Sequence, residues 1–196
     1  MDISQQTKLN PAEIADAIIN LFIKHGDEDY DGEPVSQSSH MIQCAMKAEL
    51  KGADNELTIA AFLHDVGHLL KHDLQTEAMQ QFGVVNHEGI GAAYLSERGF
   101  SERVCAVVEM HVNAKRYLVA TDETYFARLS PASIATLKWQ GGPMSKEEAT
   151  AFERHPFFED ILKVRLWDEA AKDTTIALLP LVYFEKMMIN YLLERN

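Results

Sequence analysis

The chain has 196 residues, of which 46% are hydrophobic and 24% are charged. This length suits one domain with a sizeable core, and the composition is that of a globular rather than a disordered protein. The net charge of −12 argues against nucleic acid or an anionic membrane as the main partner. The two cysteines form no CxxC motif, and neither a signal-peptide pattern nor a long apolar run is visible, so we expect a cytoplasmic protein.

Helix signals recur from the start of the chain. Asn10-Pro11-x-Glu13 combines an N-cap, a proline at the first helical position and a capping box, and predicts a helix to about residue 24. Residues 27–34, DEDYDGEP, predict an acidic loop. Ser36 then begins a second helix, which we expect to end near residue 51.

A third helix is predicted from Asp54 or Asn55 to about residue 71. Its apolar residues follow the i, i+3, i+4, i+7 pattern of one helix face; they are Ile59, Phe62, Leu63, Val66 and Leu70. Further helices are predicted at 86–99, 101–119, 130–141, from a second capping box at 145, and at 157–172 and 181–194. Because no sustained strand pattern appears, the predicted fold is all-α: a single helical bundle of about eight to ten helices over residues 1–196.

Histidine and aspartate residues recur on successive predicted helices, where a bundle can bring them together. They are His40, His64, Asp65, His87, His111 and Asp168. Six imidazole and carboxylate donors exceed what one zinc ion takes, and they suit two first-row metal ions that share a carboxylate. Asp65, between the histidines in the chain, is the natural bridge.

The stretch HDVGH, residues 64–68, allows a different hypothesis. His64 and His68 lie one helical turn apart, as in zinc peptidases, with Asp65 in the place of the general base. However, those enzymes carry glutamate there, and aspartate is one methylene shorter. The peptidase hypothesis also leaves four donors unexplained. We therefore favour two metal ions, with His68 beside the cluster.

Two cations accompany the metal donors. Lys115 follows His111 by one turn and Arg165 precedes Asp168 by three residues, so each shares a helix face with a predicted ligand. Cations beside two metal ions indicate a bound anion with several oxygens, such as phosphate or phosphonate. The alternative for Arg165 is a structural salt bridge to Asp168 or Glu169.

Polar residues elsewhere extend this hypothesis. Ser133 and Thr136, near the start of a predicted helix, could donate hydrogen bonds to the same anion, or could serve only capping and back-bonding to the helix. Tyr30 and Glu33 in the acidic loop suggest a substrate with a cationic end, although a solvated turn is the alternative.

Taken together, these residues resemble the HD-domain superfamily, and in particular the phosphonate-degrading members of its mixed-valent diiron oxygenase branch. The resemblance covers about residues 29–188. Its motifs are DYDGE, GADNE, LHDVGH, FSERV, AKRYLV, QGGPM and RLWDE.

The resemblance implies a cofactor and residue roles. Two iron ions in a mixed-valent Fe(II)/Fe(III) state would be held by the six donors, with Asp65 bridging. A mobile lid, residues 27–39, would carry Glu33 toward the substrate, while Tyr30 caps an iron at rest and moves away when substrate binds. His68 would act near the substrate without binding metal. The phosphonate would be bound by Lys115, Ser133, Thr136 and Arg165.

The resemblance also implies a reaction. A zwitterionic (R)-1-hydroxy-2-aminoethylphosphonate, or its trimethylammonio analogue, would react with O2 to give phosphate and glycine or glycine betaine. The resemblance also implies a difference: the amine-substrate members have a bulkier, charged pair where this chain has Ser38 and Ser39. The small, uncharged serines would leave room for the larger head group. Two alternatives stay open. One is an HD-type phosphohydrolase of phosphate esters or nucleotides, and the other is a metal-dependent sensor domain without catalysis.

Overall fold

The computed structural model describes residues 10–30, 32–72 and 84–195. These ranges form helices without a strand, together with an isolated antiparallel bridge between Asp29 and Ser36. The all-α prediction is therefore confirmed, with eleven α-helices in the described ranges rather than eight to ten. They are α1 (Pro11–His25), α2 (Gln37–Leu50), α3 (Asn55–Leu63), α4 (Val66–Leu69), α5 (His87–Ser96), α6 (Glu102–Thr121), α7 (Glu123–Phe126), α8 (Pro131–Trp139), α9 (Lys146–Phe152), α10 (Phe158–Glu169) and α11 (Leu181–Arg195), with the 3-10 helix η1 (Leu70–His72) after α4.

The predicted helix starts are confirmed by their hydrogen bonds. The side chain of Asn10 accepts from the N–H groups of Ala12 and Glu13, and Glu13 completes the capping box. Ser145 and Glu148 form the second capping box. A side-chain oxygen also accepts from the first turn at Ser36, Asp54, Ser101 and Ser130.

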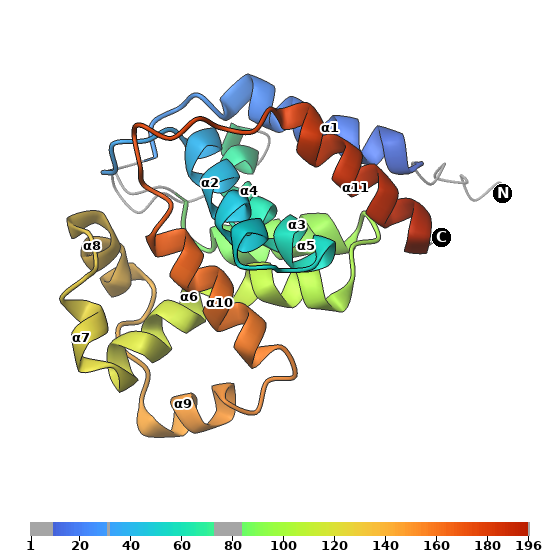
Figure 1. The fold of residues 1–196 in the computed structure, drawn as a ribbon. Coiled ribbons are helices and arrows are strands. Elements are labelled where there is room, and N and C mark those ends of the chain that lie inside the picture. Colours follow the sequence, from blue (N-terminus) through green and yellow to red (C-terminus); the bar gives the residue numbers. More distant parts are fainter. Residues whose placement is uncertain (1–9, 31, 73–83, 196) are drawn as a thin grey trace, which may run out of the picture.

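The central helix α3 lies among α2, α6, α10 and α11 (Figure 1). Its residues from Leu57 to Leu63 are all buried, as expected for a helix that is apolar on every side. α1 and α11 pack beside each other on one side of this centre, while α7, α8 and α9 lie at the opposite end (Figure 1). No helix in the described ranges is long and apolar enough to cross a membrane.

The third predicted helix is interrupted, so the prediction of one continuous helix to residue 71 was wrong. α3 ends at Leu63, and α4 begins only at Val66, after Asp65 leaves helical geometry with φ −107° and ψ 14°. The apolar residues on both sides of the break are buried. Periodicity reports burial, and burial continues across the break, so the pattern could not reveal it.

A close backbone approach joins α4 to α5. A Cβ atom on Gly67 would lie 2.0 Å from the carbonyl oxygen of His87, which only glycine permits. Asn86 stands at the predicted N-cap of α5, but it adopts φ 59° and makes no capping hydrogen bond. The contact at Gly67 therefore sets the start of α5, with His87, directly against the segment that follows Asp65.

Candidate active site

Six buried polar side chains meet between the central helices. None is more than 4% exposed, and each comes from a different helix or helix end except the neighbours at the break after α3. They are His40, His64, Asp65, His87, His111 and Asp168. The structure thus brings together all six residues that the sequence selected as metal donors.

Asp65 lies between two pairs of imidazoles. Its Oδ2 is 3.5 Å from His40 Nε2 and 3.3 Å from His64 Nε2. Its Oδ1 is 3.2 Å from His87 Nε2 and 3.3 Å from His111 Nε2. Each carboxylate oxygen therefore faces one pair, which is the arrangement needed for a carboxylate shared by two metal ions.

Asp168 adds a second carboxylate to the first pair only. Its Oδ1 is 3.2 Å from His40 Nε2 and 3.9 Å from His64 Nε2. The two halves of the cluster therefore differ, since one has two imidazoles and two carboxylates and the other has two imidazoles and the shared Asp65.

Backbone carbonyl groups set the orientation of the four imidazoles. Each Nδ1 lies within 3.2 Å of a carbonyl oxygen, from Ala171, Ala61, Val84 and Val108 respectively for the four rings in chain order. A carbonyl oxygen can only accept, so each Nδ1 carries a proton and the Nε2 of a neutral ring presents its lone pair. All four Nε2 atoms point into the cluster.

The converging donors fit metal ions. The Nε2 atoms of His40 and His64 are 3.1 Å apart, and those of His87 and His111 are 3.2 Å apart. Two Nε2 atoms at such distances need a cation between them, either a proton on one of the rings or a metal ion. In addition, Asp65 Oδ2 is buried and has no hydrogen-bond partner in the described ranges, which is costly in the absence of a cation.

Electrostatics keep the shared carboxylate ionised. Burial alone would raise the pKa of Asp65, but the imidazoles of His64, His111 and His40 outweigh it and hold that pKa well below its usual range. Asp65 is therefore an anion at neutral pH, as a metal ligand must be.

Distance alone places His68 as well as His111 near the second half of the cluster. Two groups have ligand atoms within 4.8 Å of one another: His40, His64 and Asp65, and Asp65, His68 and His87. His64 and His68 thus fall in different groups, so the structure gives no support to the zinc-peptidase hypothesis. The residues of both groups are buried histidines and aspartate able to bind metal.

Hydrogen bonding distinguishes His68 from His111. His68 Nδ1 accepts from the N–H of Val84 at 3.2 Å, and its ring stacks on His87 with centroids 4.0 Å apart. Burial and His87 lower the pKa of His68 well below its usual value, so the ring is neutral and carries its proton on Nε2. Its Nε2 is therefore a donor, whereas Nε2 of His111 offers a lone pair. The tautomers favour His111 as the second imidazole ligand.

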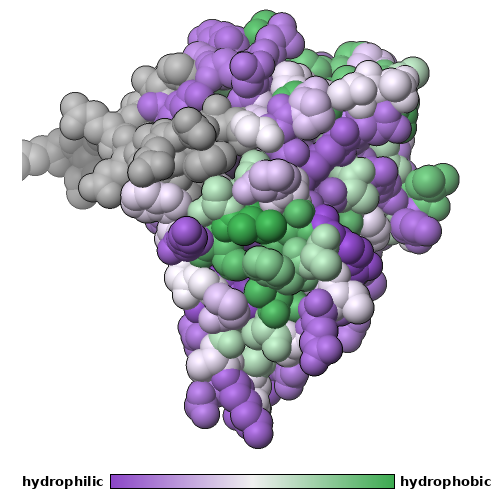
Figure 2. All heavy atoms as spheres, turned by 90° about the vertical axis from the view of Figure 1, so that its left-hand side faces the viewer, coloured by the Kyte–Doolittle hydropathy of each residue, from purple (hydrophilic) through white to green (hydrophobic). Residues whose placement is uncertain are grey.

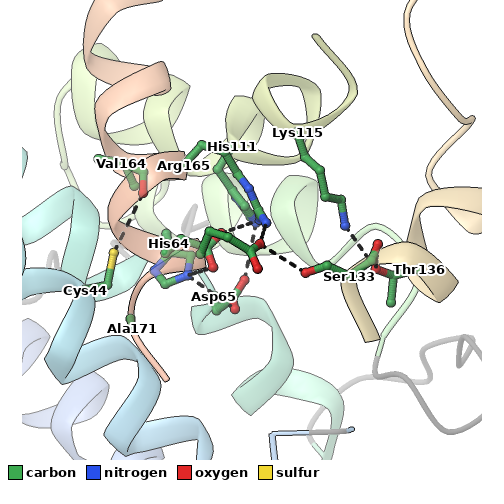
Figure 3. A network of polar contacts seen from close by, with 12 residues as sticks. Cys44, His64, Asp65, His111, Lys115, Ser133, Thr136, Val164, Arg165 and Ala171 are labelled. Carbon is green, nitrogen blue, oxygen red and sulfur yellow. Dashed lines mark hydrogen bonds and ion pairs between the residues drawn. The ribbon is translucent and has the colours of Figure 1, made fainter. Parts of the chain in front are cut away.

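A cavity of about 50 Å³ opens beside the cluster. It is lined by every residue that the sequence suggested for substrate binding or catalysis: Tyr30, Glu33, His68, Lys115, Ser133, Thr136 and Arg165. Figure 3 shows Lys115 on α6 and Ser133 and Thr136 on α8 reaching the cluster from one side. Lys115 Nζ donates to Thr136 Oγ1 at 3.0 Å, and burial together with Arg165 lowers the pKa of Lys115 to about 7.

Arg165 connects the cavity to the cluster. Its Nη1 donates to Asp168 Oδ2 at 2.5 Å, its Nε donates to the Tyr125 hydroxyl at 2.8 Å, and its Nη2 pairs with Glu169. The structural salt bridge considered for Arg165 is therefore present, on a guanidinium that also lines the cavity. Similarly, Thr136 makes the back-bond to the carbonyl of Ala132 at 3.1 Å while it lines the same space.

Tyr30 and Glu33 come from the acidic loop, and both line the cavity beside the cluster. The Tyr30 ring stacks on His40 with centroids 4.1 Å apart. Burial and the carboxylate of Asp65 raise the pKa of Tyr30 well above its usual value, so it remains a neutral phenol. Glu33 is paired with Lys172 at 2.9 Å and accepts a hydrogen bond from Ser130 at the start of α8.

Ser38 and Ser39, which we expected to make room for the larger head group, do not line the cavity. Ser38 Cβ packs against Gly26, and Ser39 Oγ accepts from Gln43. Gln37 reaches the cavity instead, because it lies on the face of α2 that carries His40, three residues on.

Sequence reasoning missed other residues of the site. Lys172 could have been found, since it follows Glu169 by three residues at the end of α10 and pairs with it at 2.8 Å. Gln37 could have been found in the same way, since it precedes His40 by three residues on α2. Tyr125, which binds Arg165 from α7, carried no such signal, because only the packing of α7 against α6 brings it there.

The helical bundle and the buried histidine–aspartate cluster define a metal-binding HD domain, and residues 38–152 match the family model "HD domain".

A hydroxymethylphosphonate dioxygenase from Gimesia maris is 37% identical over 164 residues, which are 83% of this chain and 80% of the relative. A [1-hydroxy-2-(trimethylamino)ethyl]phosphonate dioxygenase (glycine-betaine-forming) from Leisingera caerulea is 44% identical over 166 residues, 85% and 84% of the two chains. An uncharacterized protein of Acanthamoeba polyphaga mimivirus is 44% identical over 177 residues, 90% and 81% of the two chains. The chain belongs to the HD-domain family and is homologous, within it, to the phosphonate dioxygenases.

Proposed function

We propose that this chain is a dinuclear iron dioxygenase that cleaves the C–P bond of a 1-hydroxyphosphonate with O2. The products are phosphate and a carboxylate. The observation that carries the proposal is Asp65, whose two oxygens face two separate imidazole pairs beside a cavity lined by Lys115 and Arg165. The proposed substrate is (R)-1-hydroxy-2-(trimethylammonio)ethylphosphonate or its 2-amino analogue.

The donors divide between the two irons as the structure divides them. His40, His64 and Asp168 would hold one iron, His87 and His111 the other, with Asp65 shared. When bound, a mixed-valent iron pair supplies the binding of O2 and the one-electron chemistry that side chains lack.

The chain itself binds and orients the substrate. In the proposal, the Lys115 ammonium, the Arg165 guanidinium and the hydroxyls of Ser133 and Thr136 bind the phosphonate oxygens. Arg165 matches such oxygens in a bidentate way, and its bond to Asp168 ties the anion to the metal ligand. His68, neutral with N–H on Nε2, can donate to a substrate oxygen.

Residues 27–39 are proposed to act as a lid. Tyr30 covers His40 with a stacked ring and lines the cavity. In this proposal, substrate reaches the iron held by His40 only when Tyr30 moves outward. Glu33 attracts a cationic head group in this proposal, although in the closed lid its charge is balanced by Lys172.

A direct assay tests the proposed function. Protein purified with iron should consume O2 with hydroxyphosphonates and release phosphate in proportion, and it should leave phosphate esters intact. Ester hydrolysis without O2 uptake would instead establish a phosphohydrolase. Binding of hydroxyphosphonate without any turnover would favour a sensor domain.

Substrate affinity should fall as the pH rises above about 7. The pKa of Lys115 in the empty cavity is lowered to about 7, so above that pH the phosphonate must bind together with a proton. Below pH 7 the ammonium is already present and this dependence disappears. Dissociation constants measured without O2 between pH 6 and 9 check the prediction.

Lys115→Met should bind weakly and lose that pH dependence. Lys138→Met, on the exposed side of α8, is the matched control and should keep it. An unchanged pH profile in Lys115→Met would assign the dependence to another group.

A further inference from the structure

One residue that lines the cavity carries a buried acceptor without a partner among the described residues. Gln37 is only 3% exposed, and its Oε1 makes no hydrogen bond within them. Its Nε2 donates to the carbonyl oxygen of Asp29 at 3.4 Å. Because a carbonyl oxygen cannot donate, this contact fixes the amide orientation and leaves Oε1 as the free end.

Gln37 lies with the lid rather than with the phosphonate-binding groups. It stands at the start of α2 and lines the cavity together with Tyr30 and Glu33. The cationic and hydroxyl groups of the cavity come from α6, α8 and α10 instead. A substrate whose phosphonate meets Lys115 and Arg165 therefore directs its other end toward Gln37.

The neighbouring Glu33 attracts either ammonio head group through its charge, and its Oε1 is already engaged by Lys172 and Ser130. The buried amide oxygen of Gln37 carries no net charge, so it favours a head group only through an N–H or O–H donor. A primary ammonium supplies three N–H groups, whereas a trimethylammonium presents only methyl groups and leaves the oxygen desolvated without compensation.

We infer that Gln37 determines the head-group specificity of this enzyme and selects a substrate that carries an N–H donor there. This inference rests on the proposed function and settles the choice, within it, between the two ammonio substrates. Gln37 Oε1 accepts a hydrogen bond from the substrate ammonium, while Glu33 contributes attraction that both head groups share.

Three substrates separate charge from hydrogen bonding. They are 2-amino-1-hydroxyethylphosphonate, its trimethylammonio analogue, and hydroxymethylphosphonate, which lacks a head group. We expect wild-type kcat/KM for the amino compound to exceed that for the trimethylammonio compound by about tenfold or more, the effect of one hydrogen bond to a charged group. Dissociation constants measured without O2 should rank these two ligands in the same order.

Two variants isolate the acceptor. Gln37→Met and Gln37→Glu both lose the Nε2 bond to Asp29, but only Gln37→Met loses the acceptor. Gln37→Met should lower kcat/KM for the amino substrate about tenfold or more. It should change kcat/KM for the other two substrates less than about threefold. Gln37→Glu should keep the preference for the amino substrate. Glu33→Gln should lower kcat/KM for both cationic substrates, because both lose the attraction of the carboxylate.

The inference is overturned if the wild type prefers the trimethylammonio substrate. It is also overturned if Gln37→Met changes kcat/KM for all three compounds equally or for none of them. Either result would mean that Oε1 accepts no hydrogen bond from the substrate ammonium. Failure of the proposed function looks different, because no hydroxyphosphonate would then support O2 uptake, and the anaerobic binding constants would still test the ranking.

Discussion

Asp65→Asn should lose both metal ions and at least about 10³-fold in kcat/KM, a loss typical of residues that act as a unit with others in a site. The substitution keeps the size of the side chain but removes its charge. Asp65 is the one residue whose oxygens face both imidazole pairs. An amide oxygen can face only one pair, and its NH2 group would point at the Nε2 atoms of the other.

Metal analysis and O2 uptake measured on the same preparation check this prediction. His87→Ala provides a graded comparison, since His87 contacts only Oδ1 of Asp65, and it should keep one metal ion. Asp173→Asn, at an exposed aspartate that accepts a hydrogen bond from Thr175, is the control and should keep both ions. Two metal ions per chain in Asp65→Asn would refute the bridging role.

Arg165→Met should lower the free energy of unfolding by about 3–5 kcal/mol, the usual effect of removing one partner from a buried ion pair. Arg165 is 4% exposed and is the cation that pairs with Asp168 and Glu169 from within the same helix. Without it, the ion-pair contacts that Asp168 keeps within the described residues are those to His40 and His64. The variant should also lose most of its affinity for the phosphonate.

Denaturant unfolding of the metal-free protein measures this effect without a contribution from bound iron. Arg128→Met is the matched control, because Arg128 pairs with Asp122 on the surface, where both side chains are largely exposed. Surface pairs contribute about 0–1 kcal/mol, so this variant should unfold like the wild type. Equal stability of the two variants would show that the network around Arg165 does not hold the fold.

The charged neighbours of the cluster could be predicted because helical spacing relates sequence to space. Lys115 shares a face with His111, and Arg165 pairs with Asp168, as one turn of helix requires. The interruption after Leu63 could not be predicted from the apolar pattern, since core residues continue on both sides of it. Capping residues, by contrast, marked the helix starts correctly, because their hydrogen bonds are local.

The surface illustrates another limit. Figure 2 shows apolar side chains gathered on the face where α7 and α8 lie, on the left-hand side of Figure 1. The sequence does not predict this patch, because side chains of separate segments form it. Composition alone reports a typical share of apolar residues and says nothing of where they meet.

By itself, the sequence determined the helical class, the helix starts and the histidine and aspartate residues that meet in the buried cluster. These depend on interactions within a few residues, or on the chemistry of a side chain wherever it lies. Only the tertiary structure decided how the donors divide around Asp65, which ring nitrogen of His68 carries the proton, and that Gln37 rather than Ser38 or Ser39 reaches the cavity. Those outcomes depend on contacts between segments far apart in the chain, such as Gly67 against His87, and such contacts leave no periodic signal in the sequence.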